Sequence, residues 1–394
     1  MKKDNSIFPY RALFGVKQLD AIRNVFYRSW KIKEDFGYNG YYERIYTKKF
    51  ISFLKTKGYA DAVNSGTSAL FAILSSLKIN KKNRKAIISP VTNPGSITPL
   101  ALLGYKIEVI DSEINTFNIS LKELEKKLYK TQAKVLVITH YGGIPLDLKK
   151  IRKICDKKRI YLIEDCSQAH GAKIRKIQVG TFGHFSFFST MYRKNLATGG
   201  IGGIYFTKNR KKFFEIKSHT DRGKHYDSKQ FNTRDFHKYK FPALNLNLDE
   251  LSCAMGHSIL LELPNIIKKR YQIAKKIKSF FSKKTKIFKI GNIPNNSIPS
   301  LYFLTVEINC SKKQKIKILN FLKKYKIGFN EKHRELVSEW RWINKYTNKR
   351  VHNKNAYNYR KKTINLYFNE KFTKKNVDYM LNIFLKAERS LNKN

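Results

Sequence analysis

Residues 159–203 read RIYLIEDCSQAHGAKIRKIQVGTFGHFSFFSTMYRKNLATGGIGG, and this stretch carries the clearest indications of a fold and of a site. Its first part, residues 159–163, is an apolar, β-branched and aromatic run of the kind that forms a buried strand. Two acids, Glu164 and Asp165, follow where the run stops. A carboxylate at the end of a parallel strand faces the crevice in which open α/β sheets bind ligands. These acids are therefore candidate site residues.

A second apolar run, residues 182–188, leads into a polar loop that contains Lys194. Glycines crowd together directly after this lysine, at Gly199, Gly200, Gly202 and Gly203. An amine held by a glycine-rich turn, with an acid at the end of a neighbouring strand, suits a lysine that forms a Schiff base. Lys194 and Asp165 are thus the leading candidates for chemistry.

Strand-like and helix-like segments alternate over the chain between residues 59 and 161. Strands are expected at residues 60–63, 84–89, 106–111 and 134–139, and helices after residue 68, at 121–128 and at 148–157. This alternation predicts an α/β fold with a mostly parallel sheet that is covered on both faces. Earlier in the chain, helical spacing is present at residues 16–26 and 46–54, and the tyrosine- and glycine-rich residues between them suggest a loop.

The segment NSGTS, residues 64–68, lies between the first predicted strand and the helix that follows it. Free backbone N–H groups and the helix dipole at such a point can hold a phosphate. Serine and threonine are also ordinary helix N-caps, and by itself the segment fits a cap at least as well as a phosphate cradle.

The pattern changes in the last third of the chain. Residues 243–281 are expected to form helices interrupted at Pro264, and they are followed by a strand at 300–309 and helices at 312–324 and 373–391. We therefore expect a large domain over residues 1–255 and a smaller α+β domain over residues 256–394.

The chain is strongly basic, with 80 lysine and arginine residues against 29 acids in 394 residues and a net charge of +51. Such a charge can indicate nucleic-acid or anionic-surface binding. The lysines are scattered over almost every segment rather than gathered in one arm, which favours a compositional origin. We expect no specific nucleic-acid site, and only a modest preference for small polyanionic substrates.

Four cysteines lie far apart and form no CxxC pair: Cys155, Cys166, Cys253 and Cys310. This spacing argues against a metal site or a disulfide framework and fits a reducing, cytoplasmic location. The first residues lack the apolar core of a signal peptide. Residues 87–105, the longest stretch without charge, are broken by three prolines, so no membrane span is expected.

Six motifs together resemble the DegT/StrS-type nucleotide-sugar aminotransferases, a family of fold type I enzymes that use pyridoxal 5'-phosphate (PLP). The motifs stand in the family's order and are NSGTSAL from Asn64, HYGGIPLDL from His140, EDCSQAHGA from Glu164, FSFFS from Phe185, KNLATGGIGG from Lys194 and NLNLDELSCAMG from Asn245. The resemblance runs from about residue 10 to the last helix, and it implies a PLP-binding large domain with a smaller C-terminal domain.

The resemblance implies a role for each matching residue. Lys194 would bind PLP covalently, Asp165 would pair with the pyridine nitrogen and keep it protonated, and Gln168 would lie near the phenolic oxygen. Gly66 and Thr67 would offer backbone donors to the phosphate.

A serine of FSFFS, either Ser186 or Ser189, would add a hydroxyl to the phosphate site. Asn245 would reach the phosphate of a neighbouring subunit, because sites in this family are shared across a dimer. His170 and Cys166 are expected to be packing residues.

The chain departs from the family pattern at three places. Residues 191–193, Met-Tyr-Arg, are inserted before the lysine, which leaves the choice between Ser186 and Ser189 open. Asn93 stands where an aromatic ring usually stacks on the cofactor, and Asn247 stands where an arginine is usual. These positions affect cofactor stacking and substrate choice.

The resemblance implies an aminotransferase that converts a keto group of a nucleotide-linked sugar to an amine, with an amino acid such as glutamate as donor. One alternative is a PLP-dependent sugar dehydratase of the same fold. In some dehydratases a histidine stands in place of the lysine, and Lys194 argues against that version. A second alternative is a non-catalytic PLP-fold or basic binding protein, for which no separate recognition motif is present.

Overall fold

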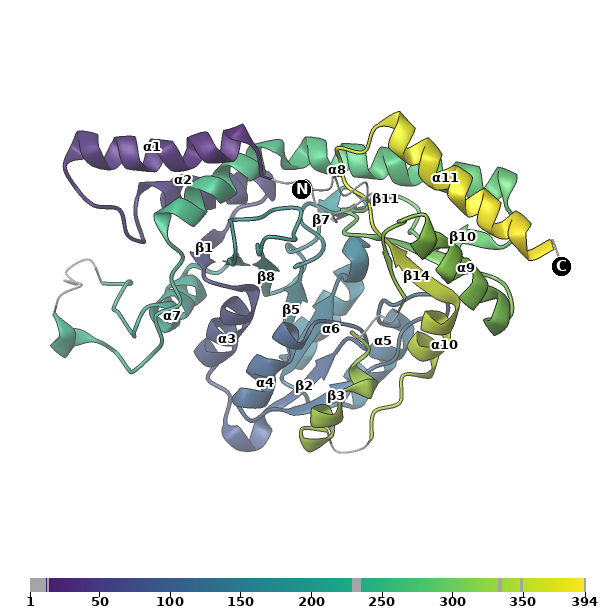
Figure 1. Ribbon diagram of the computed structural model, residues 1–394. Coiled ribbons are helices and arrows are strands. Elements are labelled where there is room, and N and C mark those ends of the chain that lie inside the picture. Colours follow the sequence, from purple (N-terminus) through teal and green to yellow (C-terminus); the bar gives the residue numbers. More distant parts are fainter. Residues whose placement is uncertain (1–11, 13, 229–234, 332–334, 348–349, 393–394) are drawn as a thin grey trace.

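The computed structural model describes residues 12, 14–228, 235–331, 335–347 and 350–392 (Figure 1). A seven-stranded sheet lies at its centre, in the order β1-β9-β8-β5-β4-β2-β3. The strands are β1 (Tyr59–Val63), β2 (Lys85–Ile88), β3 (Lys106–Val109), β4 (Val135–Thr139), β5 (Tyr161–Asp165), β8 (Phe185–Ser189) and β9 (Gly203–Thr207). Neighbours pair in parallel except at β9, which runs antiparallel to both β1 and β8. The prediction of a mostly parallel α/β sheet is confirmed.

Helices cover both faces of this sheet, because successive side chains of each strand point to opposite sides. One face carries α3 (Gly66–Ser76), α4 (Thr98–Leu102) and α7 (Arg210–Thr220), and the other carries α5 (Leu121–Lys130), α6 (Lys149–Lys158) and α2 (Tyr41–Phe53). In β5, Ile163 packs in the core under α3, whereas Leu162 packs in the core under α5 and α6. Asp165 shares the face of Ile163, so it points toward α3.

The long helix α8 (Glu250–Lys284) corrects the expectation of two helices interrupted at Pro264, because it continues through this proline (Figure 1). Proline lacks an N–H and leaves the carbonyl four residues earlier, that of Leu260, without its helical partner. Pro264 itself is exposed, whereas Leu260 is buried. Leu263 and Ile267, close to the proline, are buried and hold the helix against the molecule.

A second, smaller sheet follows α8 in the order β10-β12-β14-β13, and all of its pairs are antiparallel. Its strands are β10 (Phe288–Ile290), β12 (Leu304–Ile308), β13 (Phe329–Asn330) and β14 (Thr363–Leu366). The second half of α8, together with α9 (Lys312–Lys324) and α11 (Lys374–Arg389), builds a separate core on this sheet. Another helix, α10 (Lys354–Lys362), precedes β14. The expected α+β unit is therefore present.

The boundary expected at residue 255 stays a prediction, and it falls inside α8. Two features join the larger and smaller parts on either side. A small sheet pairs β11 (Ser297–Ile298) with the hairpin of β6 (Lys173–Ile174) and β7 (Ile177–Gln178). Val337 and Ile343 pack in the core of the large sheet, although they follow the smaller sheet's β13 in sequence.

Two helices precede the first strand, α1 (Val16–Ile32) and α2. The tyrosine-rich segment was expected to be a loop, but its second half forms the start of α2. The carboxylate of Glu250 accepts hydrogen bonds from the N–H groups of Tyr42 and Glu43, both at 2.8 Å, and so caps this helix from a distant part of the chain. None of the described helices is both long and apolar enough to cross a bilayer. Residues 1–11, where no signal peptide is expected, lie outside the described part.

Candidate active site

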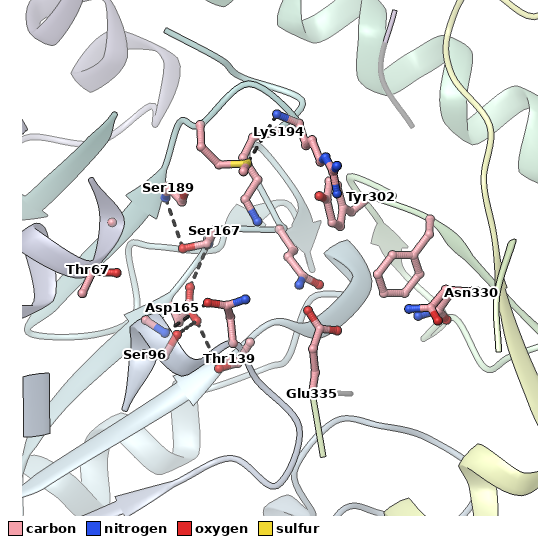
Figure 2. Close-up of a pocket in the computed structure, with 18 of the residues that line it drawn as sticks. Thr67, Ser96, Thr139, Asp165, Ser167, Ser189, Lys194, Tyr302, Asn330 and Glu335 are labelled. Carbon is pink, nitrogen blue, oxygen red and sulfur yellow. Dashed lines mark hydrogen bonds between the residues drawn. The ribbon is translucent and has the colours of Figure 1, made fainter. Parts of the chain in front are cut away.

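Strands β5 and β8 lie side by side and bring the two leading candidates to one place. In the parallel register Asp165 is opposite Phe187, and the loop after β8 carries Lys194. Both residues line a cavity of about 740 Å³ at the carboxyl ends of β4, β5 and β8 (Figure 2). This is the position at which open α/β sheets bind ligands.

Asp165 is almost fully enclosed, with 3% of its surface exposed. Its Oδ2 accepts hydrogen bonds from Ser96 Oγ at 2.6 Å and Thr139 Oγ1 at 3.2 Å, and its Oδ1 accepts one from the Ser167 N–H at 2.9 Å (Figure 2). Such bonds orient a buried carboxylate and compensate for its lost hydration. The carboxylate therefore keeps one direction at the cavity floor.

Lys194 is 9% exposed and lies in a tightly closed loop. The loop's two ends are joined by hydrogen bonds from the Thr190 N–H to the Gly202 carbonyl at 2.7 Å and from the Thr198 N–H to the Thr190 carbonyl at 2.8 Å. Burial lowers the pKa of the Lys194 amine, and the negative charges of Asp165 and Glu335 partly oppose this effect. The Nζ atom also lies 4.7 Å from the centre of the Tyr302 ring. A lowered pKa favours the neutral amine that a nucleophilic lysine needs.

The N-terminus of α3 forms another wall of the cavity. Ser65 caps the helix by accepting the Ser68 N–H at 3.0 Å, and the first intrahelical bond runs from Ala69 to the Ser65 carbonyl. The N–H groups of Gly66 and Thr67 come before this first bond, so they have no acceptor within the helix. Such N–H groups at a helix N-terminus can bind an anion. A residue with a side chain at position 66 would place its Cβ 3.0 Å from the Cβ of Ser189. This approach is tighter than ordinary packing, so the position favours glycine.

The two candidate serines of β8 have different surroundings because side chains alternate along a strand. Ser189 shares the face of Phe187 and lines the cavity. Ser186 points to the opposite face, is fully buried, and donates a hydrogen bond to the Gly180 carbonyl at 2.8 Å. It is not among the residues that line the cavity.

Gln168 and Asn93 both line the cavity. The Oε1 of Gln168 accepts the Gly142 N–H at 2.7 Å. Asn93, at the position where the resemblance implies a stacking ring, accepts the Gly95 N–H at 3.1 Å and caps a short turn.

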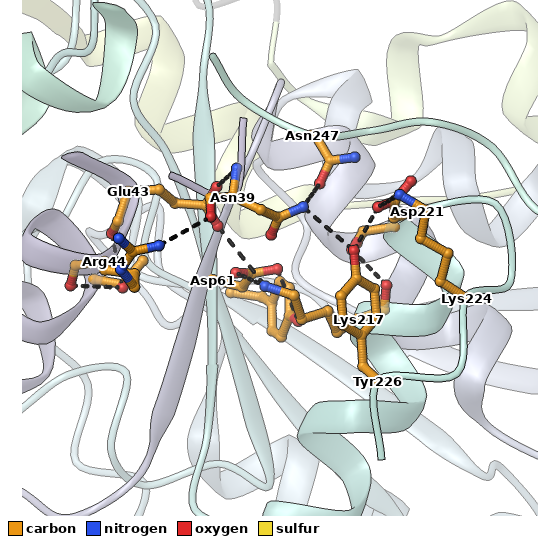
Figure 3. A network of polar contacts seen from close by, with 12 residues as sticks. Asn39, Glu43, Arg44, Asp61, Lys217, Asp221, Lys224, Tyr226 and Asn247 are labelled. Carbon is orange, nitrogen blue, oxygen red and sulfur yellow. Dashed lines mark hydrogen bonds and ion pairs between the residues drawn. The ribbon is translucent and has the colours of Figure 1, made fainter. Parts of the chain in front are cut away.

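Asn245 does not line this cavity. It is exposed, its backbone bridges to Asp221, and its side chain accepts a hydrogen bond from the Asn247 amide at 2.7 Å. A polar network holds this region (Figure 3). In it Lys224 binds Asp221 at 2.7 Å, and Asn39 donates to Asn247 at 3.3 Å.

Several cavity residues were missed by sequence reasoning. Glu335 lies near enough to Lys194 to influence its pKa, and its carboxylate accepts the Tyr141 hydroxyl at 2.6 Å. Burial raises the pKa of Glu335. Glu335 reaches the site through the backbone pairing of residues 335–337 with residues 90–92. This pairing joins distant parts of the chain, so no local sequence pattern marks the acid as a site residue. Other lining residues that were not foreseen are Ser96, Thr139, Ser167, Arg193, Tyr302, Phe303, Lys323, Asn330, Asn365 and Tyr367.

A second buried cluster joins His140, Glu164 and Cys166 on the far face of the sheet. His140 Nδ1 accepts the Leu146 N–H at 3.1 Å, so its Nε2 donates to Glu164 at 3.0 Å. Glu164 also accepts three backbone N–H groups, from Gly180, Phe182 and Gly183. These oxygens and nitrogens are already engaged, so the cluster is a hydrogen-bonded support of β5 rather than a metal site.

The chain has the fold of the fold type I PLP-dependent transferases. Solved structures agree over nearly the whole chain. The aminotransferase PseC of Helicobacter pylori has a TM-score of 0.85 at 22% identity, covering 97% of this chain and 99% of that one. An Escherichia coli GDP-4-keto-6-deoxy-D-mannose-3-dehydratase with bound hydrated PLP has a TM-score of 0.83 at 21% identity, covering 96% and 99%.

The chain belongs to the DegT/DnrJ/EryC1/StrS aminotransferase family, whose model matches residues 26–385. It is similar to the GDP-perosamine synthase of Vibrio cholerae, 29% identical over 59% of this chain and 60% of that protein. It is also similar to the spore coat polysaccharide biosynthesis protein SpsC of Bacillus subtilis, 26% identical over 71% of each. The match to the GDP-perosamine synthase of Escherichia coli O157:H7 spans 57% of that protein.

Proposed function

We propose that this protein is a PLP-dependent aminotransferase that converts a keto group of a nucleotide-linked sugar to an amine, with an amino acid such as glutamate as donor. One observation carries the proposal: Lys194 and Asp165 line the same cavity at adjacent strand ends, beside the N-terminus of α3. The relatives named as perosamine synthases support the substrate class.

PLP is the cofactor of this family, and the cavity offers chemistry that fits it. Lys194 would hold the aldehyde carbon, Asp165 the pyridine nitrogen, and Gln168 would lie near the phenolic oxygen. The N–H groups of Gly66 and Thr67 and the hydroxyl of Ser189 would hold the phosphate, in a space that a Cβ at Gly66 would narrow. Bound there, PLP would act as an electron sink for the amino group transfer.

The side chains around the cofactor would orient its partners, transfer a proton and limit the access of water. Ser96 and Thr139 hold the Asp165 carboxylate in one orientation, so that it can keep a ring nitrogen protonated. Lys194, with its lowered pKa, would accept and return a proton at Nζ during the transfer. Tyr302, from the smaller part of the molecule, would cover the amine and limit its access to water.

The alternative reaction, removal of a sugar hydroxyl on the same fold, is represented among the similar proteins. The GDP-4-keto-6-deoxy-D-mannose 3-dehydratase of Yersinia pseudotuberculosis is 26% identical over 68% of this chain. Lys194 supports transamination, because the dehydratases that carry histidine at this position lack the amine.

We further propose a homodimer with shared sites, located in the cytoplasm. Asn245 is exposed and lies outside its own cavity, as expected for a residue that serves the partner's phosphate site. Helix α1 exposes large apolar side chains, among them Val16, Tyr27 and Trp30, that a partner could cover. All four cysteines are free thiols, which suits a reducing compartment.

Absorbance spectroscopy and mass spectrometry test the function directly. The purified protein with PLP should change its absorbance when glutamate or glutamine is added, and then convert a nucleotide-linked keto sugar to a product in which nitrogen replaces the keto oxygen. Loss of a hydroxyl without incorporation of nitrogen would identify the dehydratase instead. An active species that stays monomeric in analytical ultracentrifugation would contradict the shared sites.

A further inference from the structure

A second cavity, of about 700 Å³, lies between α2, the middle of α8 and the small β6–β7–β11 sheet. It has no lining residue in common with the cavity that contains Lys194. Its volume is within the range of pockets that hold small ligands. The proposed transamination does not use it.

Five lysines line this cavity from three elements and one loop: Lys49, Lys55, Lys173, Lys268 and Lys275. Over the described ranges, the cavity lining contains no acid and no carboxylate forms an ion pair with any of the five. Burial and the nearby charge of Lys55 lower the pKa of Lys173. Positive charge is therefore concentrated here without a protein counter-charge, and an anion would relieve the repulsion.

The floor and one wall of the cavity are apolar. At Gly171 a Cβ would lie 2.5 Å from the Phe53 ring and 2.8 Å from Ile267, so the floor is closely packed. Leu261 and Ile298 are 54% and 45% exposed at the cavity wall. A purely inorganic anion would leave these side chains in contact with water.

Gln178 lies at the boundary of the cavity. It lines the cavity with only 5% of its surface exposed, and its Oε1 has no hydrogen-bond partner among the described residues. This oxygen is enclosed by the protein, and as an acceptor it calls for a hydrogen-bond donor rather than for a phosphate oxygen. The preference of the cavity for an anion is therefore carried by the five lysines.

We propose that this cavity binds an anionic amphiphile, a phosphate-bearing head group joined to an aliphatic chain. The phosphate lies among the lysines, and the chain lies along Leu261 and Ile298.

Dodecyl phosphate, kept below its micelle concentration, is a suitable probe in isothermal titration calorimetry with the full chain. We expect saturable binding that weakens with added salt. The double variant Lys55→Gln/Lys173→Gln should bind at least about tenfold more weakly, since hydrogen bonds to charged groups are lost. Gln178→Glu, which keeps the side chain's shape and adds a negative charge beside the lysines, should also weaken binding. Lys312→Gln/Lys313→Gln on the exposed start of α9 matches the charge change and should bind like the parent.

Each alternative outcome overturns the proposal in a recognisable way. Equal affinity for inorganic diphosphate would mean an anion site that does not use the apolar wall. Equal competition by dodecyl maltoside would mean a purely apolar site. Binding only to phosphatidylglycerol vesicles would mean a membrane-docking face, and unchanged affinity in the double variant would place the ligand elsewhere. A melting temperature for each variant confirms that loss of binding is not loss of fold.

Discussion

Asp165 accepts hydrogen bonds from Ser96 and Thr139, which lie on other parts of the chain, so its direction depends on its neighbours. A carboxylate that pairs with a cofactor nitrogen must hold its position to within a fraction of an ångström. Ser96, which makes the shorter of the two bonds, is therefore a positioning residue.

Replacing Ser96 with alanine should lower kcat by about tenfold, because one hydrogen bond to a buried charge is lost. The thermal stability should change little. Steady-state kinetics with glutamate as donor would measure the effect, and Ser282→Ala on the exposed end of α8 is the control. A kcat within twofold of the parent would show that Thr139 and the Ser167 N–H hold the carboxylate without Ser96.

Lys194 and Asp165 should give separable defects. Lys194→Ala should leave no PLP covalently bound after borohydride reduction, as measured by mass spectrometry, while Lys211→Ala on the exposed face of α7 should retain it. Asp165→Asn should keep the covalent attachment but lower turnover by about 100-fold or more, since the charge that supports a protonated ring is lost. Covalent PLP in Lys194→Ala would show that another lysine holds the cofactor.

At the level of elements, α8 belongs to two hydrophobic cores at once. Its first half packs with α2 and β9, and its second half packs with α11 and the smaller sheet. These contacts hold the helix together across Pro264, although proline by itself tends to kink or end a helix. The packing of the buried side chains thus outweighs the loss of one backbone hydrogen bond at the proline.

Pro264→Ala should raise the free energy of unfolding by about 1–2 kcal/mol. A proline in a helix interior destabilises the helix by about 3 kcal/mol relative to alanine. Alanine also gives the unfolded chain more conformational freedom, and this lowers the expected increase in the free energy of unfolding. Urea denaturation would measure the change, with Asn265→Ala as a neighbouring exposed control that should shift by well under 1 kcal/mol. A destabilised Pro264→Ala would show that the packing of the proline ring and its restriction of the unfolded chain outweigh the missing hydrogen bond.

At the scale of the molecule, a buried polar network joins the N-terminal segment to β1 and α7 (Figure 3). Lys217 Nζ lies 3.0 Å from Asp61 Oδ1 and 3.9 Å from Glu43 Oε1, and Glu43 also accepts the Asn39 N–H at 2.7 Å. Burial, and then the charge of Asp61, raises the pKa of Glu43 to about 9. The folded protein therefore holds a proton on Glu43 at neutral pH.

This proton makes stability dependent on pH in a defined direction. Between about pH 5 and 9 the folded state binds a proton at Glu43 that the unfolded chain releases, so the free energy of unfolding should fall as pH rises through this window. Glu43→Gln should remove that slope, whereas Glu34→Gln, an exposed acid, should not. Urea denaturation at pH 5, 7 and 9 would test this, and an unchanged slope in Glu43→Gln would mean that another group titrates.

The net charge of +51 should cause only weak, unspecific binding to nucleic acids. Affinity for two unrelated DNA duplexes should be equal and should fall steeply with salt, because binding of this kind comes from counterion release. Fluorescence anisotropy at low and physiological salt would measure it. Preference for one duplex at physiological salt would reveal a recognition site that the sequence does not indicate.

The sequence by itself determined the strand–helix alternation, the parallel strands and the two residues at adjacent strand ends. These features depend on local periodicity and on glycine and serine at turns, which neighbouring residues encode. Alternation along β8 then decides which serine can face the cavity, although the inserted residues before Lys194 hid this from the sequence.

Only the tertiary structure decided the features that depend on distant contacts. Glu250 caps α2, Glu335 reaches the cavity through pairing with residues 90–92, and packing on two cores carries α8 through Pro264. The same is true of the lysine-lined second cavity, whose walls come from segments more than a hundred residues apart. In each case the deciding energy comes from burial and hydrogen bonds between residues far apart in the chain, which no local pattern records.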